Sequence, residues 1–298
     1  MRIILTGATG FIGSKLLNVI RSHGHNLLIL TRLPNLISYD KNERYIQYKI
    51  GDDFPGEILD FSPEVLIHLA WEGIPNFSAE MCQKNVNDQI EFIKNIKKIS
   101  TLKKVIVSGS CVEYGGKTGV CYEVDRIFPN SYFSWSKQTL SDFYKIFCEE
   151  NHIKLIWFRL FYVYGPSQRA GSLIPTLLKA FQNGQSPVIR NPLMANDYIH
   201  VNDVVDAFVA GVENQEVEGI YNLGSGKLTA GHQISEIIEE LIHKTNKFSL
   251  GLVLEHLHSS QLKGFYADIS SAQVQLGWKP KLEIKEGIEL TYNSLLGA

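Results

Sequence analysis

The 298-residue sequence predicts an α/β fold, in which a doubly wound parallel sheet carries helices on both faces and a smaller domain follows. Short apolar runs such as Ile3–Leu5 and Val65–Leu69 are continuous rather than alternating, as in strands buried on both faces. Residues 79–100 between such runs place Val86 and Ile90 at helical spacing. A glycine-rich turn separates the first strand from the first helix. Strands that alternate with helices favour a parallel sheet.

Composition limits the classes of partner. Hydrophobic residues make up 44% of the chain, which suits one large domain or two closely joined domains that bury roughly 75% of the unfolded surface. The formal charge of -2 gives no reason to expect nucleic acid or an anionic membrane as a partner, so we expect small molecules. The Met1–Gly10 stretch reads as a buried strand and not as a signal peptide or membrane span.

The four cysteines have no Cys-x-x-Cys spacing, and they stand at Cys82, Cys111, Cys121 and Cys148. This scatter disfavours a zinc site or a disulfide framework. We therefore expect reduced thiols, a cytoplasmic location and no metal.

The first strand, Ile3–Leu5, leads into a turn with glycines at positions 7, 10 and 13, and a helix follows. Such glycines allow a tight turn, close approach to a pyrophosphate and packing of the helix on the sheet. The helix N-terminus adds N–H donors and a partial positive charge. The turn predicts a Rossmann-type dinucleotide site, whose candidate residues are Gly7, Thr9, Gly10, Phe11, Ile12 and Gly13.

The second strand, Asn26–Thr31, ends at Arg32. An acidic residue at this strand end would bind the ribose 2′-hydroxyl of NAD, whereas an arginine suits the 2′-phosphate of NADP. The sequence therefore favours NADP, with NAD as the other possibility. The alternative interpretation is that Arg32 is a solvated loop residue.

The Thr-Gly-x-x-Gly-x-x-Gly spacing at residues 6–13 resembles the extended short-chain dehydrogenase/reductases, which include the NAD-dependent epimerase/dehydratase family. The resemblance implies that Asp52, after a third strand at Tyr45–Ile50, lies near the adenine amine. It also implies that Leu69 and Ala70, at the end of the fourth strand, lie beside the cofactor. His68 on that apolar strand is expected to be a core histidine without a catalytic role.

The fifth strand, Lys104–Ser108, should end beside the cofactor, as strands of open parallel sheets do. The segment Ser108–Gly115 resembles the Ser-Ser-x-x-x-Tyr-Gly of the extended branch, which implies that Ser110 is the catalytic hydroxyl. The 4,6-dehydratases of this branch have an acid pair where this chain has Cys111 and Val112. Without those carboxylates, dehydration lacks its general acid and base.

The segment Ser131–Lys137 is similar to the catalytic Tyr-x-x-x-Lys, but Phe133 stands four residues before Lys137. Asn130 or Ser131 is expected to cap this helix. In the family a tyrosine at this position exchanges a proton with the substrate oxygen, and the lysine lowers the tyrosine pKa and binds the nicotinamide ribose. Phenylalanine has no such proton.

Three explanations of Phe133 remain open. The chain is a site-directed variant, Tyr132 swings into the site, or the protein is naturally weak or uses another acid. The second explanation is disfavoured because adjacent helical residues point about 100° apart.

Beyond a sixth strand at Ile156–Phe161, the chain resembles the family's substrate side with two departures: Tyr162 replaces an asparagine that meets the nucleotide sugar, and Asn196 replaces an arginine that grips the diphosphate. The resemblance implies a Rossmann domain at 1–165, to which 197–222 returns, and a substrate-binding domain at 166–298. The substrate-binding candidates are Trp71, Ser110, Tyr162, Arg169, Ser172, Arg190 and Lys263.

Three segments, 68–77, 111–115 and 160–164, resemble bacterial nucleotide-diphospho-4-keto-6-deoxysugar reductases of the dTDP-4-dehydro-6-deoxyglucose reductase type. The resemblance implies reduction at C4 of a nucleotide-diphosphate sugar with NAD(P)H, in the synthesis of surface polysaccharides. It also implies a homodimer formed through helices 79–100 and 132–150. The rival interpretations are a nucleotide-sugar C4 epimerase that retains NAD, and a dinucleotide-sensing protein without catalysis.

Overall fold

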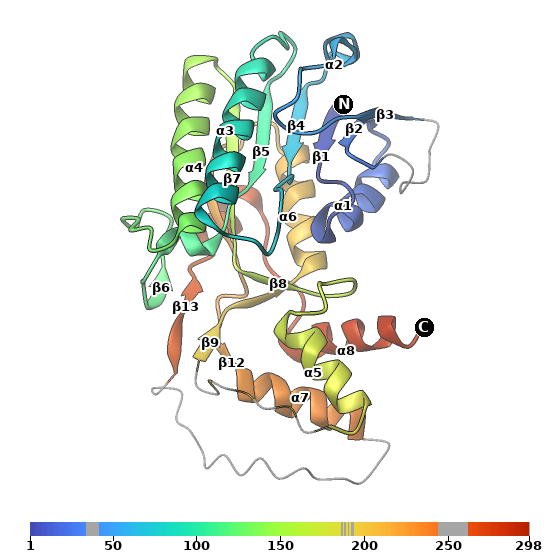
Figure 1. Cartoon of the computed structure of the whole chain (residues 1–298), viewed down its shortest axis with the longest axis vertical. Coiled ribbons are helices and arrows are strands. Elements are labelled where there is room, and N and C mark those ends of the chain that lie inside the picture. The colour runs from blue at the N-terminus through green and yellow to red at the C-terminus, as the bar shows by residue number, and fades with distance from the viewer. Residues whose placement is uncertain are drawn as a thin grey trace.

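The computed structural model describes residues 1–33, 42–185, 187, 189, 191, 194–243 and 262–297. Its central sheet has seven parallel strands in the order β11-β7-β5-β4-β1-β2-β3. The strands are β1 (Arg2–Thr6), β2 (Asn26–Thr31), β3 (Glu43–Gln47), β4 (Val65–His68), β5 (Lys104–Ser108), β7 (Lys154–Leu160) and β11 (Gly219–Leu223). The predicted doubly wound parallel sheet is confirmed (Figure 1).

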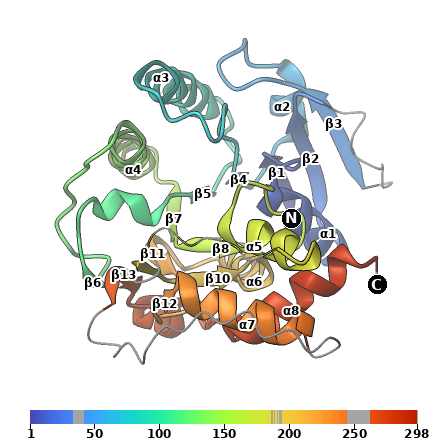
Figure 2. The same cartoon turned by 60° about the horizontal axis from the view of Figure 1, so that its bottom comes forward.

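Helices cover both faces of this sheet. One face packs against α1 (Phe11–Ser22) and α6 (Val201–Glu213), and the other against α2 (Gly56–Phe61), α3 (Ala79–Ile96) and α4 (Tyr132–Glu150). Figure 2 shows α3 and α4 together on their side of the sheet. The strand order reverses between β1 and β4, and in open α/β sheets ligands bind at the carboxyl ends of the strands beside such a reversal.

A second, smaller core lies below the carboxyl ends of the sheet (Figure 1). It joins α5 (Leu173–Gln182), α7 (Gly231–His243) and α8 (Ile284–Leu295) through buried side chains such as Leu178, Ile238 and Ile288. Two small sheets complete this half: β10 (Tyr198–His200) pairs with β8 (Tyr162–Tyr164), and the other has the order β12-β9-β13-β6. Its strands are β12 (Thr229–Ala230), β9 (Met194–Asn196), β13 (Lys263–Ala267) and β6 (Gly119–Cys121).

The two halves of the chain are interleaved. Strand β6 comes from the first half of the sequence but pairs with β13 from near the end. In the other direction, α6 and β11 return to the large sheet after residue 197. These crossings tie the two halves of the chain together. The domain boundary near residue 165 stays a prediction.

The predicted third strand and the predicted helix at 79–100 both end later than the observed elements. The third strand is Glu43–Gln47 and not 45–50, because a turn follows it in which the Asp52 N–H donates to the Lys49 oxygen at 3.0 Å. Gly51 in that turn has φ +98°, which a strand residue does not adopt. Helix α3 ends at Ile96 rather than at residue 100.

The described residues contain neither a membrane-spanning helix nor a cluster of metal ligands. None of the helices there is long and apolar enough to cross a membrane. Across the same residues, His, Cys, Asp and Glu form no group of three or more that could hold a metal ion.

Candidate active site

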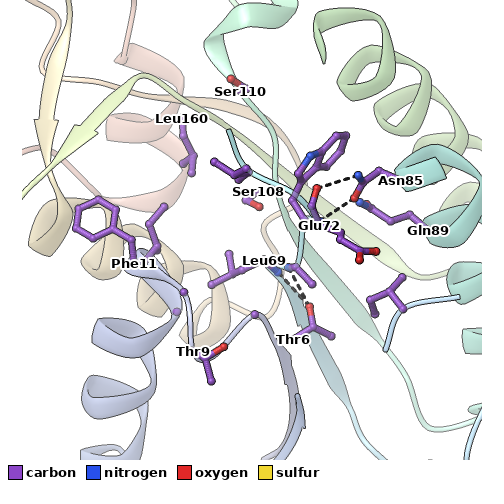
Figure 3. Close-up of a pocket in the computed structure, with 18 of the residues that line it drawn as sticks. Thr6, Thr9, Phe11, Leu69, Glu72, Asn85, Gln89, Ser108, Ser110 and Leu160 are labelled. Carbon is purple, nitrogen blue, oxygen red and sulfur yellow. Dashed lines mark hydrogen bonds between the residues drawn. The ribbon is translucent and has the colours of Figure 1, made fainter. Parts of the chain in front are cut away.

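A cavity of about 510 Å³ opens at the carboxyl ends of β1, β2, β4 and β5. Its walls come from the turn after β1, the ends of the neighbouring strands, one side of α3 and the start of α4 (Figure 3). All six turn residues proposed for the dinucleotide line it, namely Gly7, Thr9, Gly10, Phe11, Ile12 and Gly13. Ser110, Phe133 and Lys137 line the same cavity.

The glycine turn is built from backbone. Gly7 has φ +75°, and its oxygen accepts the Gly10 N–H at 3.0 Å. A Cβ on Gly13 would lie 2.1 Å from the Gly7 oxygen, so α1 can approach the turn this closely only with glycine there. Gly10 is the N-cap of α1 and provides no side-chain cap, which leaves the helix N-terminus suited to an anion such as a pyrophosphate.

Within the part of the chain that the structure describes, three buried polar side-chain atoms of cavity-lining residues have no hydrogen-bond partner: Trp71 Nε1, Gln89 Nε2 and Gln168 Oε1. Buried polar groups are almost always paired in folded proteins. Their lack of partners, together with the glycine turn, fits a cavity that receives a polar molecule such as a dinucleotide.

The other proposed cofactor contacts divide into those that line the cavity and Asp52, which does not. Arg32, Leu69 and Ala70 line it, and the Ala70 N–H donates to Thr6 Oγ1 at 3.3 Å. Asp52 is exposed and does not line the cavity, so the expected adenine contact finds no support. The turn after β3 presents Tyr48, Lys49 and Ile50 there instead.

The backbone of Ser110 is held by a buried carboxylate, that of Glu113. Its N–H donates to Glu113 Oε1 at 2.8 Å, and its hydroxyl accepts the Val112 N–H at 3.4 Å, so it caps a short 3₁₀ helix at Cys111–Tyr114. Glu113 is fully buried and pairs with the buried Arg159 at 2.8 Å. The Glu113–Arg159 ion pair therefore fixes the backbone position of Ser110, whose side chain lines the cavity.

Lys137 is nearly buried, with 7% of its surface exposed. Its Nζ donates to the Ser108 oxygen at 2.9 Å and lies 4.3 Å from the centre of the Trp71 ring. Burial lowers the pKa of this ammonium to about 8. The lysine therefore holds a proton that it can release close to neutral pH, beside Ser110 in one cavity.

Phe133 belongs to an aromatic cluster. Its ring stacks on Phe77 at 4.3 Å and meets Trp71 edge-on at 5.2 Å. Tyr132 begins α4, is 60% exposed and does not line the cavity, and Ser131 caps the helix in regular geometry. The explanation in which Tyr132 swings into the site therefore finds no support.

His68 is a satisfied core histidine, as expected. Its ring nitrogens lie 2.8 Å from Thr6 Oγ1 and 3.2 Å from Gln89 Oε1. Burial lowers its pKa to about 4, so it stays neutral at physiological pH.

A second cavity, also about 510 Å³, lies between β8, α5 and β10. Its described lining contains tyrosines, amides, Ser172 and apolar side chains but no charged residue. The rings of Tyr162 and Tyr198 lie 5.7 Å apart, and burial raises the pKa of both, so both remain hydrogen-bond donors. Gln168 and Ser172 line both cavities.

The remaining substrate-binding candidates lie in different parts of the molecule. Trp71, Arg169 and Ser172 line the first cavity, and Tyr162 lines the second. Lys263 lies on β13 and lines neither, so the structure does not bring it to the other site residues. Arg190 lies outside the described residues.

Sequence reasoning missed several residues of the first cavity, including Lys49, Glu72, Asp88 and Gln89. One signal was present: Asn85 and Gln89 are polar residues four apart on the apolar side of a helix, and both are buried. Buried polar residues at that spacing indicate that the helix face meets more than hydrophobic core.

Comparisons with known proteins agree with this architecture. The chain is 26% identical to a dTDP-4-dehydro-6-deoxyglucose reductase of Escherichia coli, with 98% of this chain and 97% of the relative covered. It is 26% identical to a CDP-abequose synthase of Salmonella muenchen, over 97% and 96% of the two chains. The solved UDP-glucuronic acid 4-epimerase of Bacillus cereus, in complex with UDP-glucuronic acid and NAD, superposes with a TM-score of 0.83 at 22% identity, covering 100% of this chain and 99% of that one.

The family assignment rests on most of the chain. The sequence pattern of the NAD dependent epimerase/dehydratase family matches residues 3–224, which contain the glycine turn, Ser110 and Lys137. With the parallel sheet and the first cavity described above, this match shows that the chain belongs to the NAD-dependent epimerase/dehydratase family.

Proposed function

We propose that the chain reduces the C4 keto group of a nucleotide-linked 4-keto-6-deoxyhexose with NAD(P)H, in the synthesis of bacterial surface polysaccharides. The observation that carries this proposal is one cavity that contains both the glycine turn and the side chains of Ser110 and Lys137. The whole-length similarity to a 4-keto reductase supports the same reaction. We further propose a cytoplasmic homodimer.

The residues divide the work of binding. The glycine turn and the start of α1 hold the dinucleotide diphosphate, Leu69 and Ala70 lie along the cofactor, and Arg32 favours NADP over NAD. When bound, the reduced dinucleotide supplies the hydride. Lys137 donates hydrogen bonds to the ribose beside the reacting centre, and Ser110 donates one to the keto oxygen.

The sugar nucleotide lies across both cavities in this proposal. Trp71 and Ser110 meet the sugar, Arg169 neutralises the diphosphate, and Ser172 and Tyr162 hold the nucleoside end. Phe133 cannot give the proton that the new alcohol needs. In an active form a tyrosine at this position supplies it, with its pKa lowered by Lys137.

The test of this proposal restores that hydroxyl. Phe133→Tyr is assayed with a dTDP-4-keto-6-deoxyhexose by following NADPH or NADH oxidation at 340 nm. We expect kcat to rise about a hundredfold, because a positioned proton donor contributes that much. Phe77→Tyr is the matched control, since it puts a hydroxyl on the ring that stacks against Phe133 at 4.3 Å. An equal gain in both variants, or none in either, contradicts the role given to position 133.

A C4 epimerase is the second candidate, because the superposed UDP-glucuronic acid 4-epimerase shares the whole fold. An epimerase oxidises and re-reduces its substrate, so it retains NAD and gives no net change at 340 nm. Dinucleotide that copurifies with the chain, together with C4 inversion of a UDP-sugar, would favour this candidate over the reductase.

A further inference from the structure

Glu72 lines the first cavity (Figure 3), and a compact group of charges surrounds its carboxylate. Its carboxylate lies 3.7 Å from Arg32, 3.9 Å from Lys49 and 2.8 Å from Lys84. Lys84 also pairs with Asp88. We call these five residues the Glu72 cluster. It contains three cations and two carboxylates, and its members come from the ends of β2 and β3, the loop after β4, and α3.

The position of Glu72 is fixed by a buried asparagine. The Glu72 N–H donates to Asn85 Oδ1 at 2.8 Å, and Asn85 Nδ2 donates back to the Glu72 backbone oxygen at 3.0 Å. A further hydrogen bond of 2.9 Å ties Asn85 to the Met81 oxygen within α3. Since Asn85 is 3% exposed, the loop that carries Glu72 is held to α3 through groups that do not involve its carboxylate.

The cations of the cluster are held unequally. Lys84 makes a direct hydrogen bond to Glu72, and this contact lowers the pKa of the carboxyl, which therefore stays ionised. Arg32 and Lys49 are only loosely paired with it, and 59% and 42% of their side chains are exposed. These two cations can therefore turn to an anionic ligand without breaking a close contact.

We propose that Glu72 sets the discrimination between NADPH and NADH by competing with the 2′-phosphate for Arg32 and Lys49. This inference rests on the proposed function, in which Arg32 receives that phosphate. When the phosphate is absent, the Glu72 carboxylate pairs with the two cations. When the phosphate binds, the carboxylate repels it. The chain consequently binds NADPH more weakly than its basic residues alone would allow, whereas NADH is unaffected.

The test is a set of binding titrations with Glu72→Gln, which keeps the shape of the side chain and removes its charge. Dissociation constants for NADPH and NADH are measured by fluorescence. We expect NADPH to bind about tenfold more tightly, equivalent to about 1.4 kcal/mol, and NADH to change less than about twofold. Adenosine 2′,5′-bisphosphate and 5′-AMP serve as competing probes that carry and lack the 2′-phosphate, and should show the same contrast.

Two further variants isolate the cause. Glu80→Gln removes one negative charge from the exposed side of α3, outside the cavity, and should leave both constants unchanged. In an Arg32→Gln background, Glu72→Gln should lose most of its effect, because coupled residues are not additive. An equal shift for both dinucleotides, no shift, or weaker NADPH binding overturns the inference while leaving the proposed function intact. Failure of the unaltered chain to bind either dinucleotide overturns both.

Discussion

The two cavities of this chain are built by different means. The first is shaped by backbone, where Gly7, Gly10 and Gly13 bring α1 against the turn, and charged residues gather at one end. The described lining of the second is formed by side chains such as Tyr162, Asn196 and Tyr198, and none of it is charged. Backbone geometry depends on a few glycines at fixed spacing, whereas side-chain recognition depends on residues from β8, α5 and β10 meeting in space. A cavity shaped by backbone can therefore be predicted from the sequence, whereas a cavity shaped by distant side chains cannot.

The largest effect should follow from breaking the backbone side of this comparison. In Gly13→Ala the added Cβ would lie 2.1 Å from the Gly7 oxygen, so the turn must move. We expect dinucleotide affinity to fall at least about a hundredfold, or about 2.7 kcal/mol, in a fluorescence titration. Gly56→Ala, where a Cβ meets nothing within 4 Å, is the control. Unchanged affinity in Gly13→Ala would show that the turn does not hold the ligand.

The second prediction concerns the cost of a charge in the first cavity. Burial shifts the Lys137 pKa from 10.5 to about 8, so the folded chain carries an ammonium that is unfavourably solvated at pH 7. Replacing it in Lys137→Met removes a penalty of about 3 kcal/mol and loses one hydrogen bond worth about 1 kcal/mol. We expect the variant to gain about 2 kcal/mol in free energy of unfolding at pH 7, measured with urea.

The pH dependence of that gain gives the check. Below pH 8 both the folded and unfolded chains hold the proton and the penalty is complete; between about 8 and 10.5 the folded lysine releases its proton first and the penalty disappears. The gain of Lys137→Met should therefore shrink as the pH rises through this window. Lys145→Met, on the exposed side of α4, should show no such trend. A gain independent of pH would contradict the buried charge.

The smallest effect should come from adding charge to the second cavity. Asn196 lines it and its Nδ2 lies 3.3 Å from the Tyr198 hydroxyl. We expect Asn196→Arg to bind dTDP or UDP about tenfold more tightly by calorimetry, because guanidinium pairs with diphosphate. Asn196→Gln, which is longer but neutral, should change little. If the arginine has no effect, the diphosphate does not approach this cavity.

Much of the large sheet and the glycine turn could be predicted because their signals are local. Continuous apolar runs mark β1 and β5, and the Gly7–Gly13 spacing marks the turn. The end of the third strand could not be predicted, since Ile50 continues the apolar pattern while Gly51 leaves it. Local pattern does not report where the chain reverses into a turn.

The rest of the site depends on contacts between distant segments. Glu72 meets Arg32, 40 positions earlier. The family resemblance implies that Asp52 lies near the adenine amine, but Asp52 is exposed and does not line the cavity. The role of Glu113 beside Ser110 depends on Arg159, which comes from strand β7, 46 positions later. Such pairs depend on the packing of whole elements, which no single stretch of sequence encodes.

Gln168 and Ser172 line both cavities, and this has a consequence for how a ligand in one cavity affects the affinity of the other cavity. The Gln168 amide N–H donates to the Val163 oxygen at 2.9 Å, while its Oε1 has no partner among the residues that the structure describes. A ligand that donates a hydrogen bond to this oxygen from one cavity changes how well the oxygen accepts a second hydrogen bond from the other cavity. The two binding equilibria are then linked, and linkage is reciprocal: whatever the first ligand does to the affinity of the second, the second does to the first by the same factor.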